Sequence, residues 1–159
     1  MSRGSIENLP QKNMEVSMKA KEYLQQAFYL DKRINSKLEQ VESLNALATK
    51  ATSTLSDMPK SPSRGTSKLE DAIVKIVDLQ EEINRDIDKL VDLKAEMVGT
   101  IKQIQNKELQ VILEKRYLCF ETWEKIAVDM NYDIRHIHRL HNLGLKETSK
   151  LIKPCHEMS

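Results

Sequence analysis

The sequence predicts an all-α protein, and its glycine, proline and charged-residue content carries the prediction. Glycine and proline together account for eight of 159 residues, about 5%, whereas roughly 12% is usual. β-Sandwiches and barrels need these residues for their many turns, and nucleotide-binding α/β folds need closely spaced glycines to hold phosphates. Proline is absent from 11–58 and from 63–153, while charged residues make up 31% of the chain. Two long, highly charged, proline-free spans indicate helices.

The first long helix is expected over residues 14–55, after a loose N-terminus at 1–13. Apolar residues recur there at steps of three and four, which is the spacing of one helical face. They are Leu24, Ala27, Leu30, Ile34, Leu38, Val41, Leu44, Ala48, Ala51 and Leu55. Residues 58–67 hold two prolines, a glycine and three serines, a composition that predicts a linker.

The second long helix is expected to begin after Ser67, whose side chain suits an N-cap, and to run to about residue 106. It shows a heptad pattern, typical of coiled coils, with two polar breaks. One column is Leu69, Ile76, Ile83, Leu90, Met97 and Ile104, and the interleaved column is Ile73, Gln80, Ile87, Lys94 and Ile101. The similar lengths of the two helices and the short linker predict a long antiparallel hairpin, resembling a coiled coil, within residues 14–106.

Such a hairpin has little interior of its own, because two helices cannot enclose an apolar core. We therefore expect residues 14–106 to join two copies of the chain into a homodimer, which would give the three or four helices of a bundle. The alternative is that the two helices fold back on the C-terminal domain of the same chain.

Charge is distributed unevenly along the chain, although the formal net charge is only +1. Residues 70–96 carry nine acidic and four basic residues, a net charge of −5. Residues 134–153 carry five basic residues against Glu147 alone, a net charge of +4, together with His136, His138 and His141. A basic C-terminal segment of this kind is typical of an element that faces nucleic acid.

Residues 107–153 are expected to form a separate domain of three short helices, at 107–118, 121–130 and 133–152, followed by a tail at 154–159. The second and third helices fit a DNA-binding helix-turn-helix, which needs a small residue at the helix crossing and a tight turn soon after it. Asn131 occupies the turn, where glycine is usual and asparagine is the next best tolerated residue. The predicted core of the motif is Trp123, Ile126, Ala127, Met130, Asn131, Tyr132, Ile137 and Leu140.

The outward face of the third short helix supplies the DNA-contacting candidates. Arginine makes bidentate contacts to guanine, and the N-terminal half of a recognition helix reaches the bases. The base-contact candidates are Arg135, His136, His138 and Arg139, and the phosphate candidates are Lys125, Lys146 and Lys150. The histidines would make DNA affinity depend on pH. The alternative is that this face is simply a solvated side of an amphipathic helix.

From Leu109 to Glu147 the chain resembles the promoter-reading C-terminal domain of bacterial sigma factors, and more closely the sigma-like domains of phage-encoded ArpU- and RinA-type late-operon regulators. The resemblance to the phage proteins covers about residues 83–147 and is specific from Arg116 to His141. The matching residues are Arg116, Tyr117, Thr122, Trp123, Glu124, Ile126, Ala127, Met130, Asn131, Tyr132, Arg135, His136, Arg139, Leu140 and His141. The resemblance implies a phage or prophage transcriptional regulator in the bacterial cytoplasm, acting on double-stranded DNA alongside host RNA polymerase. No segment resembles the sigma domain that melts promoter DNA.

Other classes of protein find less support in the sequence. No nucleophile–base pair accompanies the carboxylates of the second helix, so we expect neither an enzyme nor a cofactor. The histidines lack a nearby cysteine or acid, so no metal site is predicted, and Cys119 is expected to be buried. No apolar run approaches the length of a membrane helix. The two alternatives to a regulator are a DNA-packaging protein of the small-terminase type and a protein-interaction module that does not bind DNA.

Overall fold

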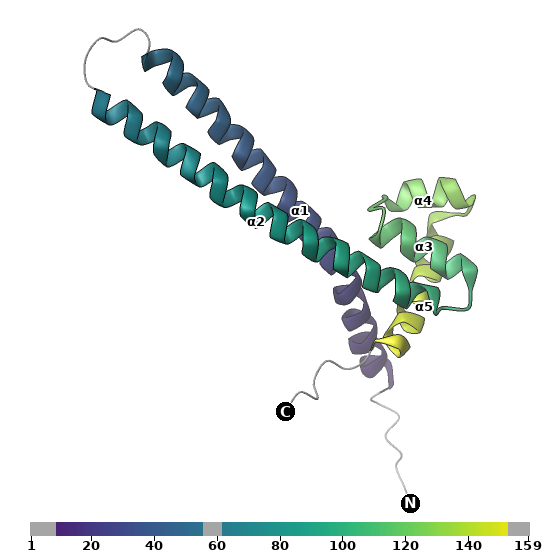
Figure 1. The fold of residues 1–159 in the computed structure, drawn as a ribbon. Coiled ribbons are helices and arrows are strands. Elements are labelled where there is room, and N and C mark those ends of the chain that lie inside the picture. Colours follow the sequence, from purple (N-terminus) through teal and green to yellow (C-terminus); the bar gives the residue numbers. More distant parts are fainter. Residues whose placement is uncertain (1–8, 56–61, 153–159) are drawn as a thin grey trace, which may run out of the picture. The chain divides into compact units, whose positions relative to one another are not determined.

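The computed structural model describes residues 9–55 and 62–152, and over these residues it contains five α-helices and no strand (Figure 1). The helices are α1 (Leu9–Leu55), α2 (Pro62–Lys102), α3 (Lys107–Tyr117), α4 (Trp123–Met130) and α5 (Ile134–Leu151). The predicted all-α class is confirmed. None of the described helices is both long enough and apolar enough to span a bilayer. Residues 1–8, part of the linker at 56–61 and the tail from 153 onward lie outside the described residues.

Both long helices begin earlier than the sequence predicted. α1 includes residues 9–13, which were expected to be loose, and α2 includes residues 62–67, which were expected to belong to the linker. Pro10 and Pro62 each lie in the first turn of their helix, where backbone N–H groups have no intrahelical acceptor and proline costs no hydrogen bond. Ser67 therefore lies inside α2 and is not its N-cap.

The chain divides into two compact units, and both long helices contribute to each. The C-terminal unit consists of residues 1–28 and 92–159, and the helical pair consists of residues 29–91. These compact units divide the chain at other positions than residue 106, where the sequence predicted a domain boundary. Met97 and Ile101, at the end of α2, are fully buried within the C-terminal unit, so this part of α2 belongs to the core of that unit.

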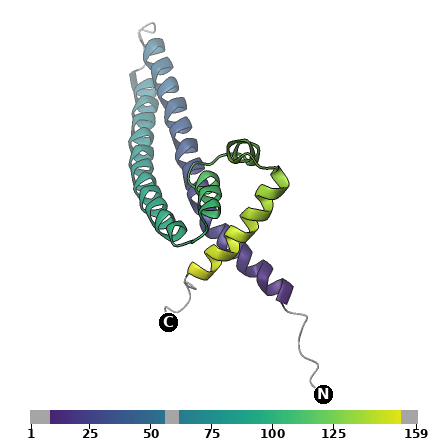
Figure 2. The same ribbon diagram turned by 90° about the vertical axis from the view of Figure 1, so that its right-hand side faces the viewer.

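The C-terminal unit has a continuous apolar core, to which all five helices contribute. Its fully buried apolar side chains are Ala20, Leu24, Ala27, Met97, Ile101, Ile112, Leu113, Ile126 and Ile137. Burial of this kind stabilises a fold by about 25 cal/mol for each Å² of apolar surface removed from water. Figure 2 shows α4 nearly end-on, with the chain turning sharply from it into α5.

The helical pair brings the remainder of α1 and α2 side by side (Figure 1), but buries far less. Only Ile34, Ile83 and Asp86 are buried among its described side chains. The Lys37 ammonium donates to Asp86 Oδ2 at 2.6 Å and lies 3.2 Å from Glu82 Oε2. An ion pair therefore occupies a position between the helices that an apolar layer would otherwise fill.

This ion pair shows that the second column of the predicted heptad was wrong at residues 73–87, whereas its last member, Ile101, is fully buried as expected. The first column is half-buried or buried, as expected, and the column beside it in the helical pair is Ala72, Leu79 and Asp86, which are half-buried or buried as well. Ile73, Gln80 and Ile87 are exposed instead, as is Leu38 on α1. The heptad pattern predicted that the isoleucines face inward because they are apolar. Asp86 faces inward instead, because Lys37 neutralises its charge.

Candidate nucleic-acid interface

The connection between α3 and α4 is fixed by a residue in an unusual backbone conformation. Phe120 has φ 57°, a region that bulky side chains rarely adopt. Its ring packs edge-on against Phe28 at 5.7 Å, and the Lys94 ammonium lies 4.7 Å from the ring centre. Thr122 then begins α4, because its hydroxyl accepts a hydrogen bond from the Lys125 backbone N–H.

The turn between α4 and α5 is built on Asn131. Its backbone is left-handed, with φ 56° and ψ 43°, as the sequence led us to expect. The Tyr132 backbone N–H donates to the Ala127 carbonyl at 3.0 Å, which closes the turn. The Tyr132 hydroxyl donates to Glu108 Oε1 at 2.5 Å and so ties the turn to α3. The direction in which α5 leaves the turn is therefore fixed by both backbone and side-chain bonds.

Close packing against α3 holds the inner side of α5. Gly144 is buried, and a Cβ added there would lie 3.3 Å from the side chain of Leu113. The Thr148 hydroxyl, also buried, donates to the Gly144 carbonyl at 2.8 Å. Ile137 and Leu140 continue the same buried side. One side of α5 is thus inaccessible, and only the opposite side can meet a partner.

His141 and Tyr117 form a buried polar pair within this core. The Tyr117 hydroxyl lies 2.6 Å from His141 Nε2. Burial is the largest cause that lowers the pKa of His141 to about 4, and Lys21, His138 and Arg116 add to it. Burial also raises the pKa of Tyr117 to about 12. His141 is therefore neutral at pH 7 and does not supply the pH-dependent charge that the sequence predicted for the histidines.

Trp123 lies at the edge of the core and carries several contacts. Its ring centre is 4.6 Å from that of His141 and 4.9 Å from that of His138. The Arg116 guanidinium lies over the indole at 4.4 Å and also donates to the Glu121 carbonyl. Trp123 is half-buried, so it packs against the core while His138 covers part of its exposed side.

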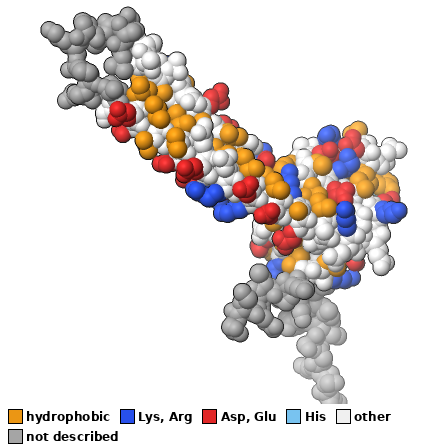
Figure 3. All heavy atoms as spheres, in the orientation of Figure 1, with side chains coloured by type: hydrophobic (Ala, Val, Ile, Leu, Met, Phe, Trp, Pro, Cys, Tyr) orange, Lys and Arg blue, Asp and Glu red, His pale blue; other side chains and the backbone are white. Residues whose placement is uncertain are grey.

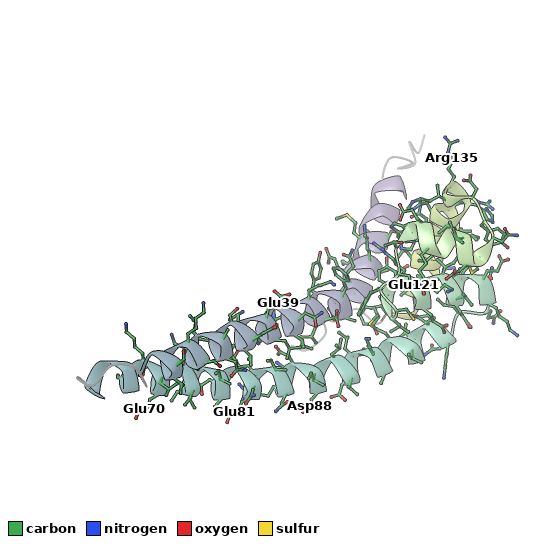
Figure 4. The ribbon with its side chains drawn as sticks, turned by 90° about the horizontal axis from the view of Figure 1, so that it is seen from above. Glu39, Glu70, Glu81, Asp88, Glu121 and Arg135 are labelled. Atoms are coloured by element: carbon green, nitrogen blue, oxygen red, sulfur yellow. The ribbon has the colours of Figure 1, made fainter. Side chains whose placement is uncertain are left out.

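The exposed side of α5 is basic along its whole length. Its exposed side chains are Arg135, His138, Arg139, Asn142, Leu143, Lys146 and Lys150. Figure 4 shows Arg135 projecting away from the helices. Among the described residues, Arg135 and Lys146 form no ion pair, so their charges remain available to a partner.

The four base-contact candidates fall into two groups. Arg135, His138 and Arg139 share the exposed side of α5, whereas His136 is half-buried at its edge. The His136 ring packs edge-on against Tyr132 at 4.6 Å, and an Arg139 guanidinium nitrogen lies 3.1 Å from His136 Nδ1. His136 is therefore placed to orient Arg139.

The three phosphate candidates also differ in their surroundings. Lys146 lies on the exposed side of α5 with the arginines. Lys150 is paired with Glu147 at 3.0 Å, and Lys125 on α4 is paired with Glu121 at 3.1 Å. Both paired lysines remain largely exposed, so a phosphate can compete for them.

Of the predicted motif core, Ile126, Ala127, Ile137 and Leu140 are buried. Trp123, Met130 and Tyr132 are half-buried, and Asn131 is exposed at the turn.

Cys119 is exposed, so its predicted burial was wrong. It lies in the turn after α3, where the half-buried Leu118 and Phe120 on either side face inward instead.

Sequence reasoning also missed the Glu108–Tyr132 and Lys115–Asp129 bonds. Both join residues that are far apart in the sequence, so no spacing along one helix reveals them.

Comparison with protein-family models, curated proteins and solved structures finds no match. Within the described part of the chain, no group of three or more metal-ligating side chains comes together.

Proposed function

We propose that the protein is a sequence-specific DNA-binding transcriptional regulator in which α4 and α5 form a helix-turn-helix and α5 enters the major groove. The observation that supports this proposal is that α5 has one buried apolar side and one exposed basic side. Gly144, Ile137 and Leu140 lock one side into the core, and Arg135, Arg139 and Lys146 line the other. Basic side chains on the only accessible side of a packed helix are typical of a recognition helix that binds in the major groove.

Within this proposal, Arg135, His138 and Arg139 read base edges from the first half of α5, with His136 positioning Arg139. Arginine at such a site donates two bonds to guanine O6 and N7. Lys146 and Lys150, further along the helix, contact phosphates, and Lys125 does so from α4. The phosphate contacts supply affinity and register, whereas the base contacts supply specificity.

The biological setting of the proposal comes from the resemblance to sigma-like domains of phage regulators. It implies a phage- or prophage-encoded protein acting in the cytoplasm of a bacterial host, on double-stranded DNA and alongside host RNA polymerase. We further propose that it acts as a homodimer, joined through the long helices between residues 14 and 106.

Selection of bound sequences from random duplex DNA tests the proposal, followed by gel-shift titration across salt. We expect one enriched motif, palindromic if the dimer is two-fold symmetric. We also expect affinity to fall steeply with salt, and the slope of log K against log salt to decrease in magnitude by about 1 in the Lys146→Ala variant.

Three outcomes would contradict the regulator. No binding to any duplex at low salt would favour the protein-interaction module. Binding with no enriched sequence would reject sequence-specific reading by α5. A ring of eight or more copies would favour the DNA-packaging protein.

A further inference from the structure

An exposed stripe runs along the side of α2 in the helical pair. It consists of Ile73, Val77, Gln80, Asn84, Ile87 and Val91, at alternating steps of four and three. The four apolar members are 49%, 48%, 41% and 61% exposed in chain order. Figure 3 shows hydrophobic side chains exposed along the helical pair. Steps of four and three are the spacing by which one helix packs against another.

The stripe is symmetric about residue 82. Ile73 and Val91 lie nine residues on either side of this position, Val77 and Ile87 lie five, and Gln80 and Asn84 lie two. Apolar side chains therefore occupy both ends, and the two amides occupy the middle. A two-fold interface requires a surface to match itself after rotation. The order of residues along this stripe meets that requirement.

We propose that two copies of the chain associate through this stripe, with their α2 helices antiparallel and the two-fold axis beside residue 82. Ile73 of each copy then packs on Val91 of the other, and Val77 packs on Ile87. Gln80 meets Asn84 of the second copy near the axis, where each amide can donate to and accept from the other. The second copy removes from water the four apolar side chains of the stripe.

The opposite side of the helical pair provides a matched control. A groove on that side is lined by Ser43 and Leu44 of α1 and by Lys75 and Asp78 of α2. Leu47 follows Ser43 by one helical turn and is 58% exposed, so it lies on the groove side. A charge introduced there changes an exposed apolar residue without touching the stripe.

Sedimentation equilibrium on the full chain tests the association, without DNA. The wild type is expected at twice the 18.4 kDa of one chain. Val77→Glu and Ile87→Glu should each raise the dimer dissociation constant roughly a hundredfold or more, because each introduces two buried charges per dimer. Leu47→Glu should leave it unchanged, with circular dichroism confirming helix content throughout. A monomeric wild type at 100 µM, or a dimer unaffected by both stripe variants, overturns the proposal.

Spin-label distances test the orientation separately. Lys68 is exposed and lies one heptad before Lys75, on the groove side, so a label there avoids the stripe. With both native cysteines replaced by serine and Lys68→Cys labelled, the antiparallel dimer separates the labels by 28 residues along the axis, about 42 Å. A single short distance would indicate parallel helices and overturn the proposed axis. Neither experiment involves DNA, so the dimer and the DNA-binding function can fail independently.

Discussion

The C-terminal unit and the helical pair differ in how much of their apolar surface they bury. In the C-terminal unit, side chains such as Leu113, Ile126 and Ile137 are fully buried. In the helical pair, only Ile34 and Ile83 are buried apolar residues among those described, and the third buried side chain is the ion-paired Asp86. Five helical segments can enclose a core, whereas two adjacent helices share only one contact surface.

This difference assigns separate tasks to the two regions. The C-terminal unit completes its core within one chain, so the exposed cations of α5 need no packing partner and are free for the proposed contact with DNA. The helical pair exposes Ile73, Val77, Ile87 and Val91, which the proposed second copy would cover. Stability should therefore respond most to substitutions inside the C-terminal unit, and the oligomeric state to substitutions in the helical pair.

The largest expected effect comes from opening the core of the C-terminal unit. Ile126→Ala removes a fully buried side chain from α4 and should lower the free energy of unfolding by about 2–5 kcal/mol. Val128→Ala, two residues further along α4, removes a side chain that is 78% exposed and should change it by about 0.5 kcal/mol or less. Urea unfolding followed by the fluorescence of Trp123, the sole tryptophan, measures both. Equal losses of unfolding free energy in the two variants would show that Ile126 is not part of a buried core in the C-terminal unit.

A pH titration tests the same core through His141. Burial lowers the pKa of His141 from 6.5 to about 4, so between these values the unfolded chain binds more protons than the folded one. Stability is therefore full above pH 6.5 and falls by about 3 kcal/mol as the pH drops to 4. Urea unfolding at pH 7, 5.5 and 4 measures the loss, and His141→Gln should abolish that part of it. Wild-type stability that stays constant over this range would show that His141 is not buried in its neutral form.

Local chemistry made the C-terminal unit more predictable than the helical pair. The starts and ends of α3, α4 and α5 lie within two residues of their predicted positions, and the left-handed turn at Asn131 follows from the tolerance of asparagine for that conformation. These features depend on residues near one another in the sequence. Phe120 was missed because its left-handed backbone is held by Phe28 and Lys94, which are distant in the sequence.

The inward side of α2 depends on a contact that its own periodicity does not contain. The spacing of apolar residues predicted that Ile73 and Ile87, rather than Asp86, face α1. Asp86 faces α1 because Lys37 of the other helix donates a hydrogen bond to it. This hydrogen bond also lowers the pKa of Asp86 below its usual value, as expected for a carboxylate that stays charged. Sequence alone does not show which lysine on one helix lies level with which aspartate on the other.

A pair of arginine substitutions compares how the exposed sides of the two regions affect DNA binding. Arg139→Ala on α5 should weaken binding to the selected duplex by about 1–3 kcal/mol and relax base preference at one position. Arg33→Ala removes an exposed arginine from the helical pair and should leave DNA affinity unchanged. Fluorescence anisotropy with the selected duplex and single-base variants measures both properties. An Arg139→Ala protein with wild-type affinity and base preference would refute the assignment of α5 as the recognition helix.

The smallest expected effect concerns the backbone at Asn131. Its φ of 56° suits glycine, so Asn131→Gly should raise the free energy of unfolding by about 0.5–1 kcal/mol, and Asn131→Ala should lower it by about 1 kcal/mol. Both variants keep the exposed side of α5 intact, so affinity for the selected duplex should change little with Asn131→Gly. Urea unfolding and anisotropy measure the two effects. A loss of stability in Asn131→Gly would mean that the asparagine side chain, rather than its tolerance of the left-handed backbone, holds the turn between α4 and α5.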